Sequence, residues 1–228
     1  MSGRRELRWV VGGQFVGALA DNALLLVALA VLFERRAPDW TAPALRIAFY
    51  LSYVLLSAFA GAVADAVPKK RVLFAINALK LCGCLVMLAG AHPLIAYALI
   101  GIGAAAHAPA RYGILAELAE DTQLVAANAW IEASTVSALL LGTVWGSLLL
   151  QGHLGIAVVA DGAAFNAAAT LGIAYLLAAL CALPVRGKPA SNPAALDHPA
   201  GLLRNFLGCV AVLWRDPPAK ISLAVTCV

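Results

Sequence analysis

The chain has 228 residues, of which 63% are hydrophobic and only 12% are charged, and its net charge is a modest +4. In ordinary water-soluble domains about a quarter of the residues are charged. This composition excludes a soluble enzyme or nucleic-acid-binding domain. With a mean hydropathy of +0.88, it indicates a membrane protein that is solvated mainly by lipid.

Six apolar runs are long enough to cross a bilayer, which takes about 20 helical residues. They predict an all-α membrane protein, a six-helix transmembrane bundle over residues 1–184. The Pro-rich stretch over 185–220 is expected to be a cytoplasmic linker with an amphipathic surface helix. A last apolar run, 221–228, is too short to span and is expected to be the truncated start of a seventh helix. The six predicted spans are 9–33, 45–66, 72–90, 94–110, 124–150 and 156–183.

The basic residues cluster beside alternate ends of these spans. Because basic residues that flank a span are retained in the cytoplasm, the pattern predicts that the N-terminus and the C-terminus both lie inside. Arg35, Arg36 and Arg46 then lie outside, and Lys80 falls within a span. The basic residues predicted on the cytoplasmic side are Arg4, Arg5, Arg8, Lys69, Lys70, Arg71, Arg111, Arg186, Lys188, Arg204, Arg215 and Lys220.

The first span contains the stretch GQFVGALADNALLLVALAVLF, with Asp21 and Asn22 at its centre. A secretory signal peptide is the alternative interpretation, because a basic segment precedes the apolar run and Ala18-Leu19-Ala20 has the form of a cleavage site. The apolar run continues to Phe33, however, and cleavage would remove one crossing and spoil the alternation of charge. We therefore expect Asp21 to lie within the membrane.

The turn between the second and third spans reads GAVADAVPKKR. Gly61 is expected to let two helices approach closely, and Asp65 follows one turn later. Lys70 and Arg71 end the turn and are expected to anchor it at anionic headgroups. The order of a Gly, three residues, an Asp and a short turn ending in two basic residues resembles the loop signature of the major facilitator superfamily.

Two residues depart from that signature: Ala66 stands where a basic residue is usual, and Pro68 stands where a glycine is usual. An ordinary positively charged loop is the alternative, but it explains the lysines and not Gly61 with Asp65 at that spacing. The superfamily builds its transporters from two halves of six spans each. The resemblance therefore implies that the chain is the N-terminal half of such a fold.

Four polar motifs interrupt the spans: ADNALLL (Ala20–Leu26), NALKL (Asn77–Leu81), GIGAAAHAPARYGILAEL (Gly101–Leu118) and ANAWIEAST (Ala127–Thr135). Together they resemble the bacterial lysophospholipid transporter family, from about Gly12 to Pro184. That resemblance implies movement of lysophospholipids, chiefly lysophosphatidylethanolamine, across the bacterial inner membrane to the cytoplasmic leaflet. It also implies a functional link to an acyltransferase/acyl-carrier-protein synthetase that restores the missing acyl chain. No cofactor is expected.

Ionisable groups inside a membrane are costly and usually face a cavity or a partner. In the superfamily, spans one, two, four and five line the central pathway, which favours Asp21 and Glu132 as pathway residues. Gln14 lies two helical turns from Asp21 on the same face, and Asn22 belongs to the same motif. For Lys80, in span three, two interpretations stay open. It contacts substrate, or it neutralises a carboxylate and holds three helices together.

Arg111 follows the fourth predicted span in the sequence PARYG, where Pro109 is expected to end the helix. A guanidinium there can bind a phosphate through two parallel hydrogen bonds. We predict that Asp21 attracts the amine of an ethanolamine headgroup, or exchanges cationic partners as the protein changes conformation, and that Arg111 binds the phosphate of the headgroup. In the alternative, Arg111 only anchors the helix end or pairs with Glu117 or Glu120 in the cytoplasmic loop.

Two other functions stay open on the sequence. One is a proton-coupled exporter of drugs or small metabolites, with Asp21 and Glu132 as proton carriers. The other is a half-transporter that does not transport alone, because the opposite six-helix wall of the pathway is missing from it. An enzyme is not expected, since the chain has no nucleophile elbow, zinc-binding HExxH motif, phosphate loop or clustered His and Cys ligands.

Overall fold

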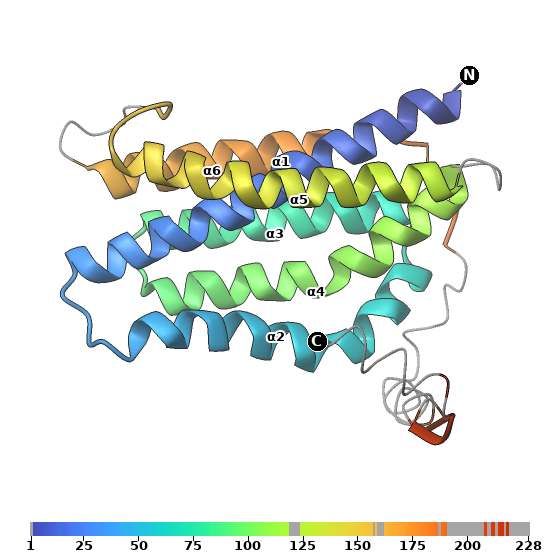
Figure 1. Ribbon diagram of the computed structural model, residues 1–228, viewed down its shortest axis with the longest axis horizontal. Helices are drawn as coiled ribbons and strands as arrows, with labels where there is room; N and C mark the ends of the chain where they lie inside the picture. The colour runs from blue at the N-terminus through green and yellow to red at the C-terminus, as the bar shows by residue number, and fades with distance from the viewer. Residues whose placement is uncertain are drawn as a thin grey trace.

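The computed structural model is an all-α bundle whose helices run side by side (Figure 1). The structure describes residues 2–118, 124–156, 158, 162–186, 188–190, 208, 211–212, 214–216 and 218. Within these residues the helices are α1 (Ser2–Glu34), α2 (Thr41–Ala66), α3 (Lys69–Leu88), α4 (Pro93–Leu118), α5 (Leu124–Leu150) and α6 (Ala163–Leu180).

The predicted six-helix membrane bundle is confirmed. Five of the helices are long and apolar enough to cross a membrane by themselves, and α2 provides a sixth span when its two parts are counted together. α2 bends by 62° between Leu56 and Phe59. In the later part of the predicted linker over 185–220, where the surface helix is expected, Gly208, Ala211, Val212 and Trp214 are exposed and have helical backbone. That helix stays a prediction, and 221–228 lies outside the described residues.

The structure differs from the predicted spans most clearly at α4 and α6. α4 continues to Leu118 with Pro109 inside it, so the predicted end of the fourth span at Ala110 is wrong. A proline removes one backbone hydrogen bond, and a helix embedded among neighbouring helices tolerates that loss. α6 begins at Ala163 rather than Ile156, and the Ile156 amide donates to the Thr170 side chain at 3.0 Å.

Glycines with left-handed backbone follow two of the helices. α3 is followed by Gly90 with φ 89°, and α5 by Gly152 with φ 79°. Glycine adopts this left-handed backbone without a Cβ penalty. After Gly90, the Ala91 amide donates to the Val86 carbonyl at 3.2 Å, which satisfies a carbonyl of the last helical turn.

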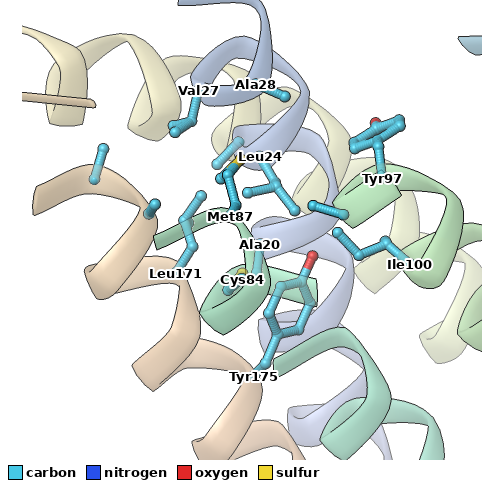
Figure 2. Packing of buried hydrophobic residues seen from close by; sticks show 14 of the residues in the cluster. Ala20, Leu24, Val27, Ala28, Cys84, Met87, Tyr97, Ile100, Leu171 and Tyr175 are labelled. Atoms are coloured by element: carbon cyan, nitrogen blue, oxygen red, sulfur yellow. The ribbon is translucent and has the colours of Figure 1, made fainter. Parts of the chain in front are cut away.

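Helices distant in the sequence provide most of the packing. α1 packs against α5 and α6, α3 against α4 and α6, and α2 against α4. Figure 2 shows the central core, where Ala20, Leu24 and Val27 of α1 meet Leu171 and Tyr175 of α6. The small residues of α1 let these helices approach closely, as is usual in membrane bundles.

The two ends of the bundle differ in charge. The N-terminus and the turn between α2 and α3 lie at one end, and the α1–α2 and α3–α4 connections lie at the other (Figure 1). The first end carries Lys69, Lys70 and Arg71, whereas Arg35 and Arg36 lie at the second. The distribution places more basic residues at the end where the chain begins.

Candidate functional site

The first polar group lies at the centre of the bundle, where α3 and α6 reach α1. Lys80 Nζ lies 2.6 Å from Asp21 Oδ2, and the Tyr175 hydroxyl donates to Asp21 Oδ1 at 2.8 Å. Lys80 Nζ also lies 5.8 Å from the centroid of the Tyr175 ring, close enough for a cation–π contribution. The Lys80 side chain is 2% exposed and that of Asp21 27%. One carboxylate thus holds three helices together, the structural role left open for Lys80.

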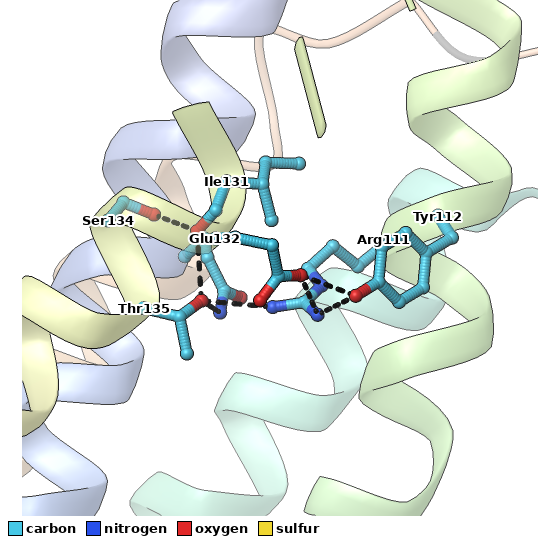
Figure 3. Close-up of polar contacts among 7 residues, drawn as sticks. Arg111, Tyr112, Ile131, Glu132, Ser134 and Thr135 are labelled. Atoms are coloured by element: carbon cyan, nitrogen blue, oxygen red, sulfur yellow. Dashed lines mark hydrogen bonds and ion pairs between the residues drawn. The ribbon is translucent and has the colours of Figure 1, made fainter. Parts of the chain in front are cut away.

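The second polar group joins α4 to α5 (Figure 3). Arg111 Nη1 donates to Thr135 Oγ1 at 3.1 Å, and its Nη2 donates to the Tyr112 hydroxyl at 2.7 Å and to Glu132 Oε1 at 3.3 Å. The Tyr112 hydroxyl in turn donates to Glu132 Oε1 at 2.5 Å. Glu132 is 53% exposed and the Arg111 side chain 10%. The guanidinium is thus enclosed, while its anion faces open space.

Thr135 connects this second group to α1. Its hydroxyl donates to the Ile131 carbonyl at 2.9 Å, so its oxygen accepts from both Arg111 and Gln14 Nε2, the latter at 3.3 Å. Gln14 is buried. Gln14, a predicted pathway residue of α1, therefore contacts α5 and takes part in the Arg111 group.

The structure shows which opposite charges lie together, and the predicted headgroup roles of Asp21 and Arg111 stay predictions. The cation that meets Asp21 is Lys80, and the anion that meets Arg111 is Glu132. Because α4 continues past Pro109, Arg111 lies inside a helix that faces α5 and not in a loop. Glu117, one alternative partner for Arg111, pairs with Lys69 instead, and the other, Glu120, lies outside the described residues.

Asn22, beside Asp21 in the sequence, makes a local contact. Its Nδ2 donates to the Ala18 carbonyl at 2.7 Å, one turn earlier in α1. The side-chain amide of Asn22 thus donates to the backbone of its own helix. The predicted role of Asn22 in the pathway stays a prediction.

The loop motif is built differently from the expectation. Gly61 is exposed, and a Cβ there would meet no atom within 4 Å, so the expected close approach is not made within the described residues. Asp65 and Arg71 are also exposed. Lys69 is buried instead, and its Nζ lies 2.5 Å from Glu117 Oε1 at the end of α4.

Two carboxylates fasten the segment after α6 to this end of the bundle. Glu117 Oε2 accepts the amide N–H of Lys188 at 3.0 Å, and Glu6 Oε2 accepts that of Arg186 at 3.0 Å. Glu117 therefore bridges Lys69 of α3 and the chain that leaves α6. The loop motif acts through Lys69 in this contact, and Lys70 has no such role in the part of the chain that the structure describes.

Sequence reasoning missed three members of these groups. Tyr112 lies within the PARYG motif and Thr135 ends ANAWIEAST, so both lay inside stretches already singled out. Tyr175 lies in an apolar span, where a buried tyrosine usually finds a partner for its hydroxyl. That rule is the signal that could have found it. Among the described residues, no cluster of three His, Cys, Asp or Glu side chains could hold a metal ion.

Comparison with known proteins places this architecture. The chain is 39% identical over 222 residues to the lysophospholipid transporter LplT of Serratia proteamaculans, a match that covers 97% of the chain and 53% of that protein. It is 39% identical over 217 residues to LplT of Yersinia enterocolitica and 38% identical over 222 residues to LplT of Yersinia pestis (strain Pestoides F), covering 51% and 52% of those proteins. The chain thus spans about half the length of the curated relatives it matches.

Residues 10–228 match the Major Facilitator Superfamily, and this match covers all six helices except the first residues of α1. Together with the apolar helices, it identifies a multi-pass membrane protein. The chain belongs to the Major Facilitator Superfamily.

Proposed function

We propose that the chain forms half of a lysophospholipid transporter that moves lysolipids, chiefly lysophosphatidylethanolamine, to the cytoplasmic leaflet of the bacterial inner membrane. The observation that carries this proposal is 39% identity, over nearly the whole chain, to proteins named for lysophospholipid transport. A cytoplasmic N-terminus is supported by the basic cluster Lys69-Lys70-Arg71 at the end of the bundle where the chain begins.

The Arg111 group is suited to a zwitterionic headgroup. Lysophosphatidylethanolamine carries a phosphate anion and an ammonium cation, and Arg111 with Glu132 offers the opposite charges 3.3 Å apart. Since Glu132 is half exposed, it can turn to an incoming ammonium at little desolvation cost. The guanidinium then binds the phosphate in place of Glu132, as its planar fork favours.

Asp21 serves as a second anion in this proposal. Both of its oxygens are occupied by Lys80 and Tyr175, yet its side chain keeps 27% of its surface exposed. We assign it the exchange of Lys80 for a cationic partner as the protein changes conformation. Of the two roles predicted for Asp21, this is the exchange of cationic partners.

A second six-helix half completes the pathway in this proposal. Transporters of this superfamily rock two halves around a site at their interface. α5 is less buried than α1, α3, α4 or α6 and exposes large apolar side chains, among them Trp130, Leu140 and Val144. Such a face suits either lipid or the second half. An acylation reaction at the cytoplasmic face, carried out by an acyltransferase/acyl-carrier-protein synthetase, consumes the delivered lysolipid.

The test uses bacterial cells that lack their own lysolipid uptake. They express the 228-residue chain alone, or together with the half of the Serratia transporter that the chain does not match. The readout is conversion of externally supplied radiolabelled lysophosphatidylethanolamine to the diacyl lipid. We expect conversion only with both halves, and its loss when the chain carries Arg111→Ala.

Two results would contradict the proposal. One is absence of conversion although both halves are present in the membrane. The other is that the paired halves lower the accumulation of cationic dyes without moving lysolipid, which would favour the drug-exporter alternative. Conversion by the chain alone would contradict the need for a second half and leave the substrate assignment intact.

A further inference from the structure

A small cavity lies between α1, α3, α4 and α6, with a volume of about 20 Å³. Three buried polar residues, Gln14, Asn77 and Arg111, line it, and His107 lies at its wall. Each of the three has one buried polar atom without a hydrogen-bond partner: Gln14 Oε1, Asn77 Oδ1 and Arg111 Nε. Such atoms are rare in folded proteins, so three around one cavity indicate a bound group.

The surrounding hydrogen bonds fix which atoms are unpaired. Asn77 Nδ2 donates to the Leu73 carbonyl at 2.9 Å, so Oδ1 is the atom left without a partner. The Thr135 hydroxyl donates its proton to the Ile131 carbonyl, so it can only accept from Gln14. Gln14 therefore donates through Nε2, and its Oε1 is left without a partner. Both terminal nitrogens of Arg111 donate hydrogen bonds, to Thr135 of α5 and to Tyr112. Only Nε is left without an acceptor. The unpaired set is therefore two acceptors and one donor.

We propose that the cavity binds one water molecule, which donates to Gln14 Oε1 and Asn77 Oδ1 and accepts from Arg111 Nε. Water has two protons to donate and lone pairs to accept, which matches the unpaired set. A cavity holds a water when it offers about 10–15 Å³ and two to four polar partners, and this cavity has that volume and three polar residues in its lining. The charge of Arg111 disfavours a cation in the cavity, and the two amide oxygens disfavour an anion.

The bound water joins α1, α3 and α4 through residues that share no direct hydrogen bond in the part of the chain that the structure describes. By accepting from Nε, the water also fixes the orientation of the Arg111 guanidinium, whose two terminal nitrogens donate to Thr135 and Glu132 of α5. This last consequence rests on the proposed function, since a phosphate is bound best by a guanidinium fixed in advance. The water site itself does not depend on lysolipid transport.

The direct test is an experimental structure of the unaltered chain in lipid nanodiscs, at a resolution that shows ordered water. We expect one density peak at about 2.7–3.2 Å from Gln14 Oε1, Asn77 Oδ1 and Arg111 Nε. An empty cavity, or side chains turned so that these atoms pair with each other, would overturn the proposal.

A second measurement uses the midpoint of thermal unfolding. Asn77→Leu keeps the side-chain size and removes one acceptor of the water, so we expect the midpoint to fall by about 2–4 °C. In a dry cavity the same change removes an unpaired amide oxygen and leaves the midpoint unchanged or higher. Asn128→Leu is the matched control, because Asn128 Oδ1 is also buried and unpaired but Asn128 does not line the cavity.

Combining each change with Gln14→Met separates a shared water from separate effects. The double variant Gln14→Met with Asn77→Leu should lose less stability than the sum of the two single losses, because the same water is lost only once. Gln14→Met with Asn128→Leu should be additive. Additivity in both pairs overturns the shared water, and since no lipid is involved, that outcome leaves the proposed function standing.

Discussion

The two ion pairs within this bundle differ in what surrounds them. Lys80 is 2% exposed and its partner Asp21 also accepts from Tyr175, so this pair is enclosed by α1, α3 and α6. Glu132 is 53% exposed and lies 3.3 Å from Arg111 at the α4–α5 contact. Removing a partner from the first pair leaves a charge in a poorly solvated interior, whereas the second pair has open space beside it. Two charge pairs of similar chemistry thus suit different tasks: the enclosed pair holds helices and exchanges its cation only when the protein changes conformation, whereas the exposed pair can exchange partners directly.

The largest expected effect follows from breaking the enclosed pair. Lys80→Met leaves the Asp21 carboxylate without a cation, and the loss of one partner of a buried pair costs about 3–5 kcal/mol of unfolding free energy. The measurement is denaturant unfolding of the purified chain in a mild detergent. The tyrosine bond to Asp21 remains and keeps the loss at the lower end.

The control for Lys80→Met removes both charges. Asp21→Asn combined with Lys80→Met should recover most of the lost unfolding free energy, because no unpaired charge remains. Asp21→Asn alone should be destabilised, since it leaves the Lys80 ammonium 2% exposed and unpaired. If the double variant is no more stable than Lys80→Met, the stability does not depend on the pairing of the two charges, and the enclosed pair does not hold the helices as described.

A second prediction concerns the close contact between α1 and α5, the helices that carry Asp21 and Glu132. Gly142 of α5 lies against α1 so closely that a Cβ would come 2.5 Å from the Leu19 carbonyl oxygen and 3.0 Å from Asn22 Cβ. Gly142→Ala must therefore push α5 away from α1, at an expected cost of about 1–3 kcal/mol. The check is the same unfolding measurement. Gly12→Ala is the control, because a Cβ at Gly12 would meet no atom within 4 Å.

The fold could be predicted from the sequence because bilayer thickness fixes the length of an apolar span. Six runs of sufficient length predict six helices, and α5 has the predicted bounds, 124–150. The prediction failed at α4, because the rule that proline ends a helix holds when the lost hydrogen bond has no compensation. α4 continues through Pro109 to Leu118, and in membrane helices neighbouring groups can satisfy the carbonyl that a proline leaves free.

The candidate site could be predicted only as a set of residues. A carboxylate in an apolar span signals a partner, so Asp21 and Lys80 were both recognisable from the sequence. Which cation meets which anion depends on how each helix is rotated and where it crosses its neighbours. Asp21 and Lys80 are 59 residues apart, and no local pattern encodes that contact. The same is true of Tyr175, which reaches Asp21 from α6.

The smallest effect on stability is expected at the exposed pair. Glu132→Gln removes an anion that is 53% exposed, while Arg111 keeps its bonds to Thr135 and Tyr112. Exposed pairs contribute about 0–1 kcal/mol, so the unfolding free energy should change by no more than that. Thr143→Val is the control on α5, because Thr143 is exposed and its hydroxyl donates only within its own helix, to the Leu139 carbonyl at 2.9 Å.

The same Glu132→Gln variant tests whether the exposed pair binds the headgroup, when transport is measured with a second half present. Loss of a charged hydrogen bond to the ammonium is worth about 1.5–3 kcal/mol, so the lysolipid concentration for half-maximal conversion should rise roughly tenfold or more. Thr143→Val should leave it unchanged. If Glu132→Gln instead costs as much stability as Lys80→Met and leaves lysolipid conversion intact, both pairs hold helices. The cation of the headgroup would then have to be recognised at Asp21, through the displacement of Lys80.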